Sequence, residues 1–183
     1  MKLGKHWVAH VELSDKPDEW VSVVNEIPAD SSCKYRLDKT TGQLSLARVL
    51  PRSITYPTSY GFIPHTRSKA DDEETDVMIV TSEPVLPLTI ARARIIGGFA
   101  ETSSDLGVPD DRMIAVVEND PNTAELKDVD DLEAALRTRI ERFVVEYKQN
   151  EDIQVTFDGW FDRAEALERL RKAFKLGKKR AAK

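Results

Sequence analysis

Apolar and polar side chains alternate with a strand-like period over the first two-thirds of the chain, and turn signals separate the successive runs. We expect irregular loops at residues 52–65, which are rich in Pro, Tyr and Ser, and at residues 101–111, which follow Gly97 and Gly98. Short strands with turns between them indicate an antiparallel barrel or sandwich. The predicted strands cover residues 20–27, 34–37, 44–50, 77–81, 89–96 and 112–117.

The period changes in the last third of the chain. From Asp130 to Lys148, apolar residues recur at spacings of three and four, which predicts an amphipathic helix. A short strand is predicted at residues 153–157, and Asp162 with Glu165 forms a capping box at the start of a second helix. The predicted class is therefore α+β, mostly β, with helices packed on a barrel.

Composition indicates an ordinary globular protein. The 183 residues are 40% hydrophobic and 32% charged, which fits a single domain over residues 1–183. Residues 1–18 are expected to be an N-terminal extension to which the pattern assigns no element. Residues 175–183 are expected to be a basic, frayed and solvated tail.

Charge and cysteine content limit the partners. The formal net charge of −5 argues against a general nucleic-acid binder, whose surface is usually basic. The single cysteine, Cys33, excludes an internal disulfide and fits a reducing compartment. No apolar run approaches the roughly 20 residues needed to span a bilayer, and the N-terminus lacks the apolar segment of a secretory signal. We expect a cytoplasmic protein without a membrane partner.

The most unusual stretch is the acidic run at residues 71–76 (DDEETD), which leads directly into the apolar run Val77-Met78-Ile79-Val80. Carboxylates held close together repel one another unless a cation or a proton compensates them. This loop is either spread into solvent or coordinates a metal. Because it adjoins a strand of the core, some of its side chains must point toward the domain.

Further acidic and basic residues stand at the ends of other elements. Oxygen ligands in number suit Mg²⁺ or Mn²⁺, and lysine and arginine supply contacts to phosphate. Spacing alone leaves both a metal–phosphate site and solvated loops open. The residues concerned are the acids Asp105, Asp110 and Asp111 and the bases Lys34, Arg48, Arg112 and Lys148.

Seven elements in one order resemble family I soluble inorganic pyrophosphatases. They extend from about residue 19 to residue 148, and the acidic loop is one of them. The resemblance implies an oligonucleotide/oligosaccharide-binding-type (OB-type) five-stranded barrel with flanking hairpins and two C-terminal helices. It also implies a homo-oligomer. The other six elements are Glu26-Ile27-Pro28, Lys34-Tyr35, Asp38-Lys39-x-x-Gly42, Arg48, Tyr56-Pro57-x-x-Tyr60-Gly61 and Tyr147-Lys148.

The activity implied by this resemblance is Mg²⁺-dependent hydrolysis of diphosphate to two phosphates by direct attack of a metal-activated water. Glu73 stands where the family has an aspartate that orients and deprotonates that water. Two cations lower the pKa of a bridging water enough for a carboxylate to generate hydroxide near neutral pH. The implied metal ligands are Asp71, Asp76, Asp105 and Asp110, with Glu26 bonding metal-bound water. The implied diphosphate-binding residues are Lys34, Arg48, Tyr60, Arg112, Tyr147 and Lys148.

Three departures from the family pattern weigh on this prediction. The loop carries Glu73 and Glu74 where the family has Asp-Pro, and one extra residue lets Asp72 compete with Glu73 for the role of base. Arg36 stands where the family usually has a glutamate, and it disfavours a nearby metal unless it pairs with Asp72 or Glu74. Arg112 replaces a family lysine, with a different reach toward phosphate.

Two other functions are weighed against the enzyme. A catalytically weak or inactive paralogue would keep the fold and act as a metal- or phosphate-binding regulatory or interaction module. Arg36 and Glu73 motivate that alternative. An oligonucleotide-binding barrel is disfavoured by the net acidity and by carboxylates in the presumed groove.

Overall fold

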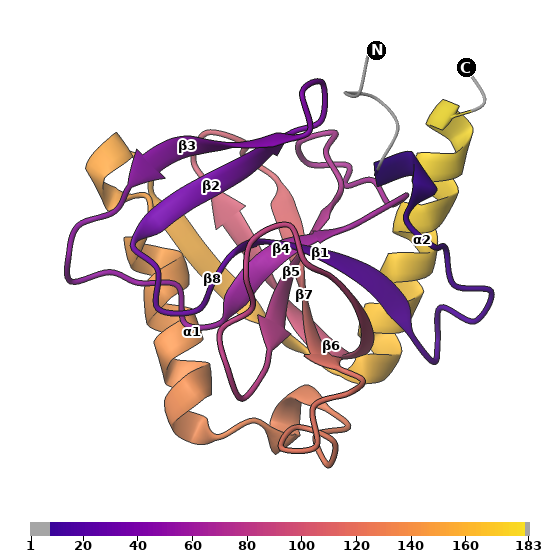
Figure 1. The fold of residues 1–183 in the computed structure, drawn as a ribbon. Coiled ribbons are helices and arrows are strands. Elements are labelled where there is room, and N and C mark those ends of the chain that lie inside the picture. The colour runs from indigo at the N-terminus through magenta and orange to yellow at the C-terminus, as the bar shows by residue number, and fades with distance from the viewer. Residues whose placement is uncertain (1–7, 182–183) are drawn as a thin grey trace.

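The computed structural model describes residues 8–181, so the first seven residues of the expected N-terminal extension lie outside the description. Strands make up most of the regular structure, with two α-helices toward the C-terminus (Figure 1). The elements are the 3₁₀-helices η1 (Val8–His10), η2 (Val129–Asp131) and η3 (Gln149–Glu151), the strands β1 (Val21–Ile27), β2 (Cys33–Asp38), β3 (Gln43–Val49), β4 (Ser59–Ile63), β5 (Thr75–Val80), β6 (Ile90–Ser103), β7 (Pro109–Val117) and β8 (Val155–Phe161), and the helices α1 (Ala134–Glu146) and α2 (Arg163–Ala181).

Five strands close into a ring. Their order is β1-β4-β5-β7-β6, and a further pairing of β6 with β1 joins the two ends. All of these pairings are antiparallel except β5 with β7. Closure removes the free edges that a sheet would otherwise expose. The predicted five-stranded barrel is therefore confirmed, and β8 extends it by pairing with β6.

The hairpin of β2 and β3 lies outside the ring as a separate two-stranded sheet. Its turn contains Gly42 at φ 73°, a conformation that favours glycine. Lys34 and Arg48 are register partners, and the pairing shifts between Lys34 and Tyr35. The hairpin thus places two predicted phosphate-binding residues side by side.

The two helices lie on different sides of the barrel (Figure 1). One apolar cluster joins barrel residues such as Met78, Phe99 and Ile114 to Phe143 of α1. A second cluster joins the opposite faces of the same strands to α2. Side chains on successive strand positions point to opposite faces, so both faces of the barrel wall are buried.

Two strand predictions are wrong, and glycine is the reason in both cases. Residues 59–63 form β4 rather than an irregular loop, and a Cβ at Gly61 would lie 1.8 Å from the carbonyl oxygen of Val24. Strand β6 does not stop at Gly97 and Gly98 but continues to Ser103. At Gly98, a Cβ would lie 2.4 Å from the carbonyl oxygen of Arg112. These glycines permit close packing of the backbone and do not end the strands.

The C-terminal tail also differs from the prediction. Helix α2 continues through Ala181, so residues 175–181 are helical rather than frayed. Ala173 accepts a hydrogen bond from the backbone N–H of Arg67, and a Cβ at Gly177 would lie 2.1 Å from the carbonyl oxygen of His65. The last turns of α2 are therefore docked on the segment that leads into the acidic loop.

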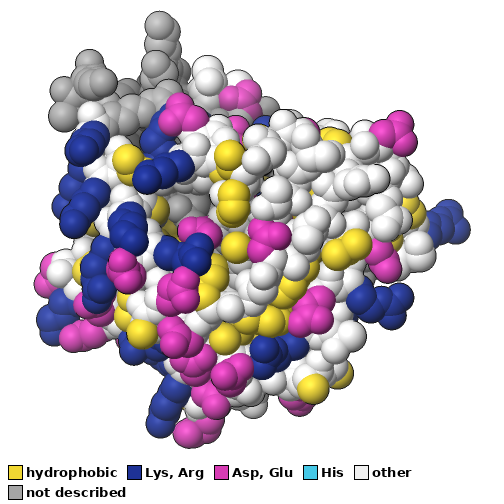
Figure 2. Space-filling view, turned by 180° about the vertical axis from the view of Figure 1, so that it is seen from behind, with side chains coloured by type: hydrophobic (Ala, Val, Ile, Leu, Met, Phe, Trp, Pro, Cys, Tyr) yellow, Lys and Arg dark blue, Asp and Glu magenta, His cyan; other side chains and the backbone are white. Residues whose placement is uncertain are grey.

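None of the helices in residues 8–181 is long and apolar enough to cross a lipid bilayer. On the face seen in Figure 2, basic and acidic side chains are interspersed and apolar side chains form narrow patches. A mixed surface of this kind differs from the continuous basic stripe typical of nucleic-acid binders.

Because α2 is docked at Gly177, we expect Gly177→Ala to change stability in the opposite direction from the same substitution in a solvated helix. In a solvated helix this change stabilises by roughly 1 kcal/mol, because glycine is a poor helix former. Here we expect it to destabilise the protein by more than about 1 kcal/mol, because the new methyl group meets the carbonyl oxygen of His65. Denaturant unfolding measures the difference. Lys178→Ala, at an exposed position of the same turn, is the control, and a stabilised Gly177→Ala would contradict the docking.

Candidate active site

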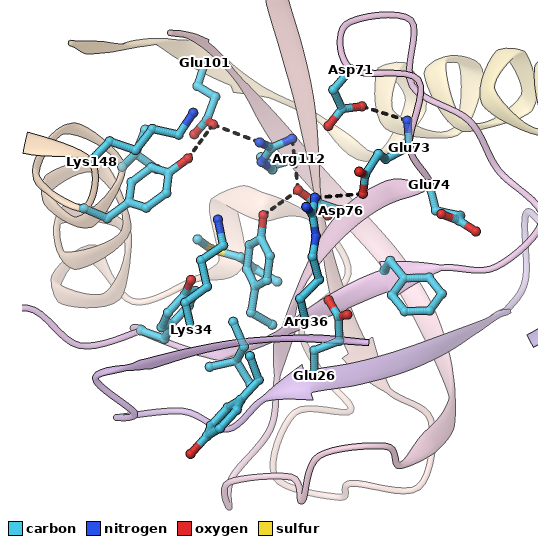
Figure 3. Close-up of a pocket in the computed structure, with 18 of the residues that line it drawn as sticks. Glu26, Lys34, Arg36, Asp71, Glu73, Glu74, Asp76, Glu101, Arg112 and Lys148 are labelled. Atoms are coloured by element: carbon cyan, nitrogen blue, oxygen red, sulfur yellow. Dashed lines mark hydrogen bonds and ion pairs between the residues drawn. The ribbon is translucent and has the colours of Figure 1, made fainter. Parts of the chain in front are cut away.

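A pocket of about 230 Å³ opens between the β2–β3 hairpin, the loop before β5 and the end of α1 (Figure 3). Its volume is just below the ~300–1,000 Å³ typical of small-molecule sites, so it suits a compact ligand. Arg48 and Asp110 do not line it. The predicted site residues that do line it are Glu26, Lys34, Tyr60, Asp71, Glu73, Asp76, Asp105, Arg112, Tyr147 and Lys148.

The pocket forms where one face of the barrel wall changes from apolar to polar. In β7, Asp110 and Arg112 lie on the face of the strand opposite to the one that packs on α2. Farther along the strand, this face carries Ile114 and Val116, which belong to the core under α1. In β5, Asp76 precedes Met78 on that face. Each strand therefore contributes polar side chains at one end of an otherwise apolar row.

Arg112 lies at the floor of this polar region. Its side chain is only 9% exposed, and its Nη1 lies 3.3 Å from Oδ2 of Asp76 and 2.5 Å from Oδ2 of Asp110. Its Nη2 donates to Oε1 of Glu101 at 3.0 Å. A charge removed from water needs such compensation, because an unpaired buried charge is costly.

Burial raises the pKa of both Asp76 and Glu101, while the positive charge of Arg112 opposes that rise. The hydroxyl of Tyr60 donates to Oδ2 of Asp76 at 2.7 Å, and the hydroxyl of Tyr147 donates to Oε1 of Glu101 at 3.2 Å. Two predicted diphosphate contacts are thus positioned by carboxylates.

Side chains of the acidic loop form ion pairs with basic residues. Arg36 donates from Nη2 to Oε2 of Glu73 at 2.8 Å, rather than to Asp72 or Glu74, the two acids whose pairing would have compensated it. Glu74 instead pairs with Lys39. The loop reaches Arg36 because β2 lies beside it, with Glu73 curled back toward the hairpin (Figure 3).

The structure separates Asp72 from Glu73, which the sequence left as competitors for the base. Asp72, at φ 63°, pairs with Arg67, and its side chain is 74% exposed and does not line the pocket. Glu73 lines the pocket, and its backbone N–H donates to Oδ1 of Asp71 at 3.0 Å. Of these two carboxylates, Glu73 is therefore the one that lines the pocket.

Three cations surround the ring of Tyr147 on the opposite side of the pocket. The distances to its ring centroid are 6.0 Å for Lys34, 5.7 Å for Arg48 and 5.8 Å for Lys148. Burial, with the nearby charge of Arg48, lowers the pKa of Lys34 to about 8. Glu151 pairs with Arg48, and Oδ2 of Asp105 lies 3.4 Å from Nζ of Lys148, so an incoming anion would share these two cations with carboxylates and add compensation for Lys34.

Arg48 and Asp110 stand behind the lining residues. Arg48 pairs with Glu151, yet its Nε and Nη2 are buried without a hydrogen-bond partner. Asp110 accepts from Ser68 and from Arg112, which lies between it and the pocket. Both positions are close to the site without facing it.

Glu26 occupies the floor beside the hairpin. Its Oε1 accepts a hydrogen bond from the backbone N–H of Leu37 at 2.6 Å, and burial raises its pKa to about 7. A carboxyl group that titrates near neutral pH can exchange a proton with water in the pocket.

Glu101 lines the pocket and was missed by sequence reasoning, which placed it in a polar loop. The available signal was the alternation of Phe99, Glu101 and Ser103 beyond Gly97 and Gly98, all three being buried. Reading the glycines as a strand end concealed it.

Oxygen donors in the pocket fit a hard divalent ion. Within residues 8–181, no three His, Cys, Asp or Glu side chains already converge on one point. Mg²⁺ does not require such a cage, because one or two carboxylates, water and substrate phosphates commonly complete its shell. Asp71 and Asp76, at the two ends of the acidic loop, supply that number of carboxylates at the pocket.

Comparison with known proteins agrees with this arrangement. The family model described as inorganic pyrophosphatase matches residues 23–178. A soluble inorganic pyrophosphatase of Zea mays is 37% identical over 155 residues, covering 85% of this chain and 71% of that protein. Soluble inorganic pyrophosphatase 2 of Chlamydomonas reinhardtii is 39% identical over 84% of this chain and 78% of its own length.

Solved structures give the same result. The crystal structure of inorganic pyrophosphatase from Thermus thermophilus superposes with a TM-score of 0.86 at 32% identity, covering 92% of this chain and 97% of that one. An inorganic pyrophosphatase from Helicobacter pylori gives a TM-score of 0.86 at 30% identity, covering 92% and 98%.

The lowered pKa of Lys34 is testable by acylation. Only the neutral amine reacts, so we expect the labelling rate of Lys34 to rise with a midpoint near pH 8, whereas an ordinary lysine has a pKa near 10.4. Mass spectrometry of labelled peptides over a pH series gives the midpoint. Arg48→Met removes a repelling charge and is expected to move the midpoint upward. A midpoint above about pH 10 in the unaltered protein would contradict the burial of this amine.

Proposed function

The chain belongs to the inorganic pyrophosphatase family, and we propose that it hydrolyses inorganic diphosphate to two phosphate ions. The observation that carries this proposal is the division of one small pocket into a carboxylate side and a cationic side. Asp71, Glu73 and Asp76 face Lys34 and Lys148 across it (Figure 3). Such a pocket suits a small polyanion that binds together with a divalent cation.

The cationic side binds the substrate. Lys34, Arg48 and Lys148 supply positive charge around Tyr147, and a bound anion would compete with Glu151 for Arg48 and with Asp105 for Lys148. Arg48 acts on this space through its charge, because its unpartnered Nε and Nη2 are buried behind the lining residues. The hydroxyl groups of Tyr60 and Tyr147 point into the same space, and Arg112 adds a charge at the floor.

The proposed cofactor is Mg²⁺, with Mn²⁺ as the alternative. Asp71 and Asp76 would hold it, with Asp105 and Glu26 as further oxygen groups at the pocket that bind directly or through water. Asp110, the other predicted metal ligand, is engaged by Ser68 and Arg112 behind the lining residues. When bound, the ion lowers the pKa of a coordinated water and neutralises charge on the phosphoryl group.

Glu73 is the proposed general base. It accepts a proton from water as the water oxygen attacks one phosphorus atom, the bond from that phosphorus to the bridging oxygen breaks, and the second phosphate departs with the bridging oxygen. Lys34, Arg48 and Lys148 stabilise the charge that develops on the phosphoryl oxygens. Positioning and electrostatics thus carry most of the catalysis.

The ion pair between Arg36 and Glu73 controls the availability of this base. The two side chains are 59% and 46% exposed, and an exposed pair of this kind contributes roughly 0–1 kcal/mol. Bound diphosphate can therefore take Arg36 over as a phosphate contact and release Glu73. The pair slows the enzyme without abolishing it.

A weak or inactive paralogue is the second candidate. The Arg36–Glu73 pair is the observation that favours it, because the carboxylate oxygen that Arg36 engages is not free to accept from water. Such a protein would bind metal or phosphate as a regulatory or interaction module. A cytoplasmic location and a homo-oligomeric state stay predictions from the sequence, as does the absence of a nucleic-acid partner.

Loss of Asp76 tests the enzyme. We expect Asp76→Asn to lower phosphate release from diphosphate by about a hundredfold or more with either Mg²⁺ or Mn²⁺, because it removes a proposed metal ligand and a partner of Arg112. The matched control is Asp15→Asn, at an exposed position outside the pocket. Absence of turnover in the unaltered protein with both metals would refute the activity. Unchanged turnover in Asp76→Asn would refute the assignment of the site.

Release of Glu73 tests the role of Arg36. We expect Arg36→Gln to raise kcat by up to about fivefold, since the exposed pair contributes at most ~1 kcal/mol. Arg36→Glu combined with Glu73→Asp is expected to raise it further. Arg139→Gln, which breaks a surface pair with Asp30, is the control. If kcat falls in Arg36→Gln while KM rises, Arg36 contributes to substrate binding more than it restrains the base.

A further inference from the structure

Two buried carboxylates face each other beside the pocket, which Glu101 lines and Asp110 does not. Glu101 of β6 and Asp110 of β7 are direct register partners, and they are only 3% and 2% exposed. Like charges directly opposite on neighbouring strands repel, and burial makes the repulsion stronger. Something in the structure must compensate them.

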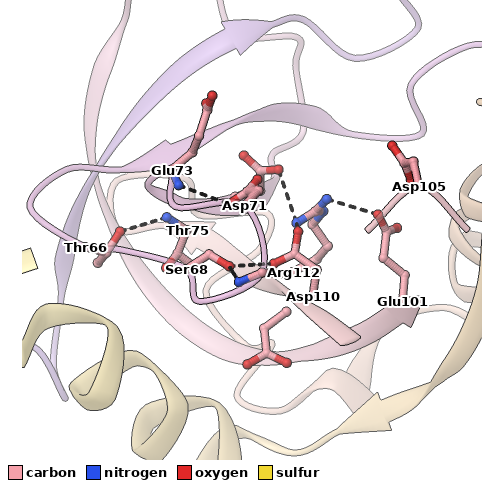
Figure 4. Close-up of polar contacts among 12 residues, drawn as sticks. Thr66, Ser68, Asp71, Glu73, Thr75, Glu101, Asp105, Asp110 and Arg112 are labelled. Carbon is pink, nitrogen blue, oxygen red and sulfur yellow. Dashed lines mark hydrogen bonds and ion pairs between the residues drawn. The ribbon is translucent and has the colours of Figure 1, made fainter. Parts of the chain in front are cut away.

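Arg112 is that compensation (Figure 4). Its Nη2 lies 3.0 Å from Glu101, and its Nη1 lies 2.5 Å from Asp110 and 3.3 Å from Asp76. One guanidinium thus bridges carboxylates from β5, β6 and β7. Its Nη1 lies in the space between Asp76 and Asp110, where a cation held by both aspartates would sit.

The guanidinium is fixed in that place. Glu101 is itself held by the hydroxyl of Tyr147, which donates to the same Oε1 that Arg112 contacts. The guanidinium is planar with donors in a fixed fork, so Glu101 at Nη2 sets the direction of Nη1. Ser68 holds the other oxygen of Asp110 at 2.8 Å. Asp76 and Asp110 thus contact Nη1 of Arg112 in the positions they already occupy.

A divalent ion cannot share this place with Nη1. Mg²⁺ binds carboxylate oxygens at about 2.0–2.1 Å with near-octahedral geometry, which leaves no room for a nitrogen between the same two oxygens. The two cations would also repel each other at short range. Occupancy by one excludes the other.

We propose that Arg112, held in place by Glu101, is a resident cation that occupies the position between Asp76 and Asp110, so that the pocket binds one divalent ion fewer than its carboxylates would otherwise allow. This inference rests on the proposed metal-dependent function. Glu101 acts as a positioning residue. It orients Arg112 and has no proposed contact of its own with the metal or the substrate. The remaining divalent site is at the open side of the pocket, where Asp71 lies.

The test replaces the pair and counts bound metal. Glu101→Met combined with Arg112→Met removes one negative and one positive charge, so the net charge of the chain is unchanged. Mn²⁺ is titrated into each protein without substrate, and free Mn²⁺ is measured by electron paramagnetic resonance. We expect the double variant to bind one more Mn²⁺ per chain than the unaltered protein.

The matched control is Glu168→Met with Lys172→Met, which removes an exposed ion pair of α2. It is expected to bind the same number of ions as the unaltered protein. If the double variant fails to fold, Arg112→Lys replaces it in the test. Lysine has one ammonium group, and when Glu101 holds that group the position of Nη1 is empty. It is expected to gain one Mn²⁺ with weaker affinity than the double variant.

Equal Mn²⁺ stoichiometry in the unaltered protein and in the folded variants would overturn the inference. Diphosphate turnover by the unaltered protein, measured on the same preparations, separates this result from failure of the proposed function. Turnover with unchanged Mn²⁺ stoichiometry supports the proposed enzyme and refutes the resident cation. A gained ion without any turnover supports the resident cation and refutes the enzyme.

Discussion

The carboxylates of Asp76, Glu101 and Asp110 lie on three adjacent strands, and the guanidinium of Arg112 compensates all three. Removing one member of such a buried network typically costs ~3–5 kcal/mol, because the others keep their charge without a partner. The polar face of β5, β6 and β7 therefore depends on this side chain. Tyr147 joins the end of α1 to it through Glu101, so the position of this helix end depends on the same contact.

Closure of the barrel supplies the rigidity that this network needs. Because β6 pairs with β7 on one side of Glu101 and with β8 on the other, Glu101 cannot shift without disturbing two ladders. The acidic loop is held less tightly, by Asp110 through Ser68 and by the docking of α2 beside Arg67. The site thus combines a fixed floor with a rim that a ligand can rearrange, which suits a reaction in which ions and anions enter and leave.

The sequence predicted most of this arrangement because period and register are local properties. The alternation before Pro28 and after Asp111 identified barrel strands, and seven ordered motifs brought Asp71, Asp76, Tyr147 and Lys148 to one pocket. It failed where packing between distant segments decides the outcome. Gly61 and Gly98 are needed because backbone segments distant in the sequence pack where a Cβ would lie. The partner of Arg36 depends on how the acidic loop folds back toward β2. No spacing rule gives these contacts.

Two arginines at the same pocket have opposite consequences because their burial differs. Arg36 is 59% exposed, and water screens its attraction to Glu73, so a phosphate can replace that carboxylate at a cost of about 1 kcal/mol or less. Arg112 is 9% exposed, and the surrounding protein strengthens each of its contacts, so no ligand displaces it. The departure that looks most disruptive in the sequence is therefore the easier one to reverse. The exchange of a family lysine for arginine at position 112 leaves the charge unchanged, and burial holds the guanidinium among the three carboxylates.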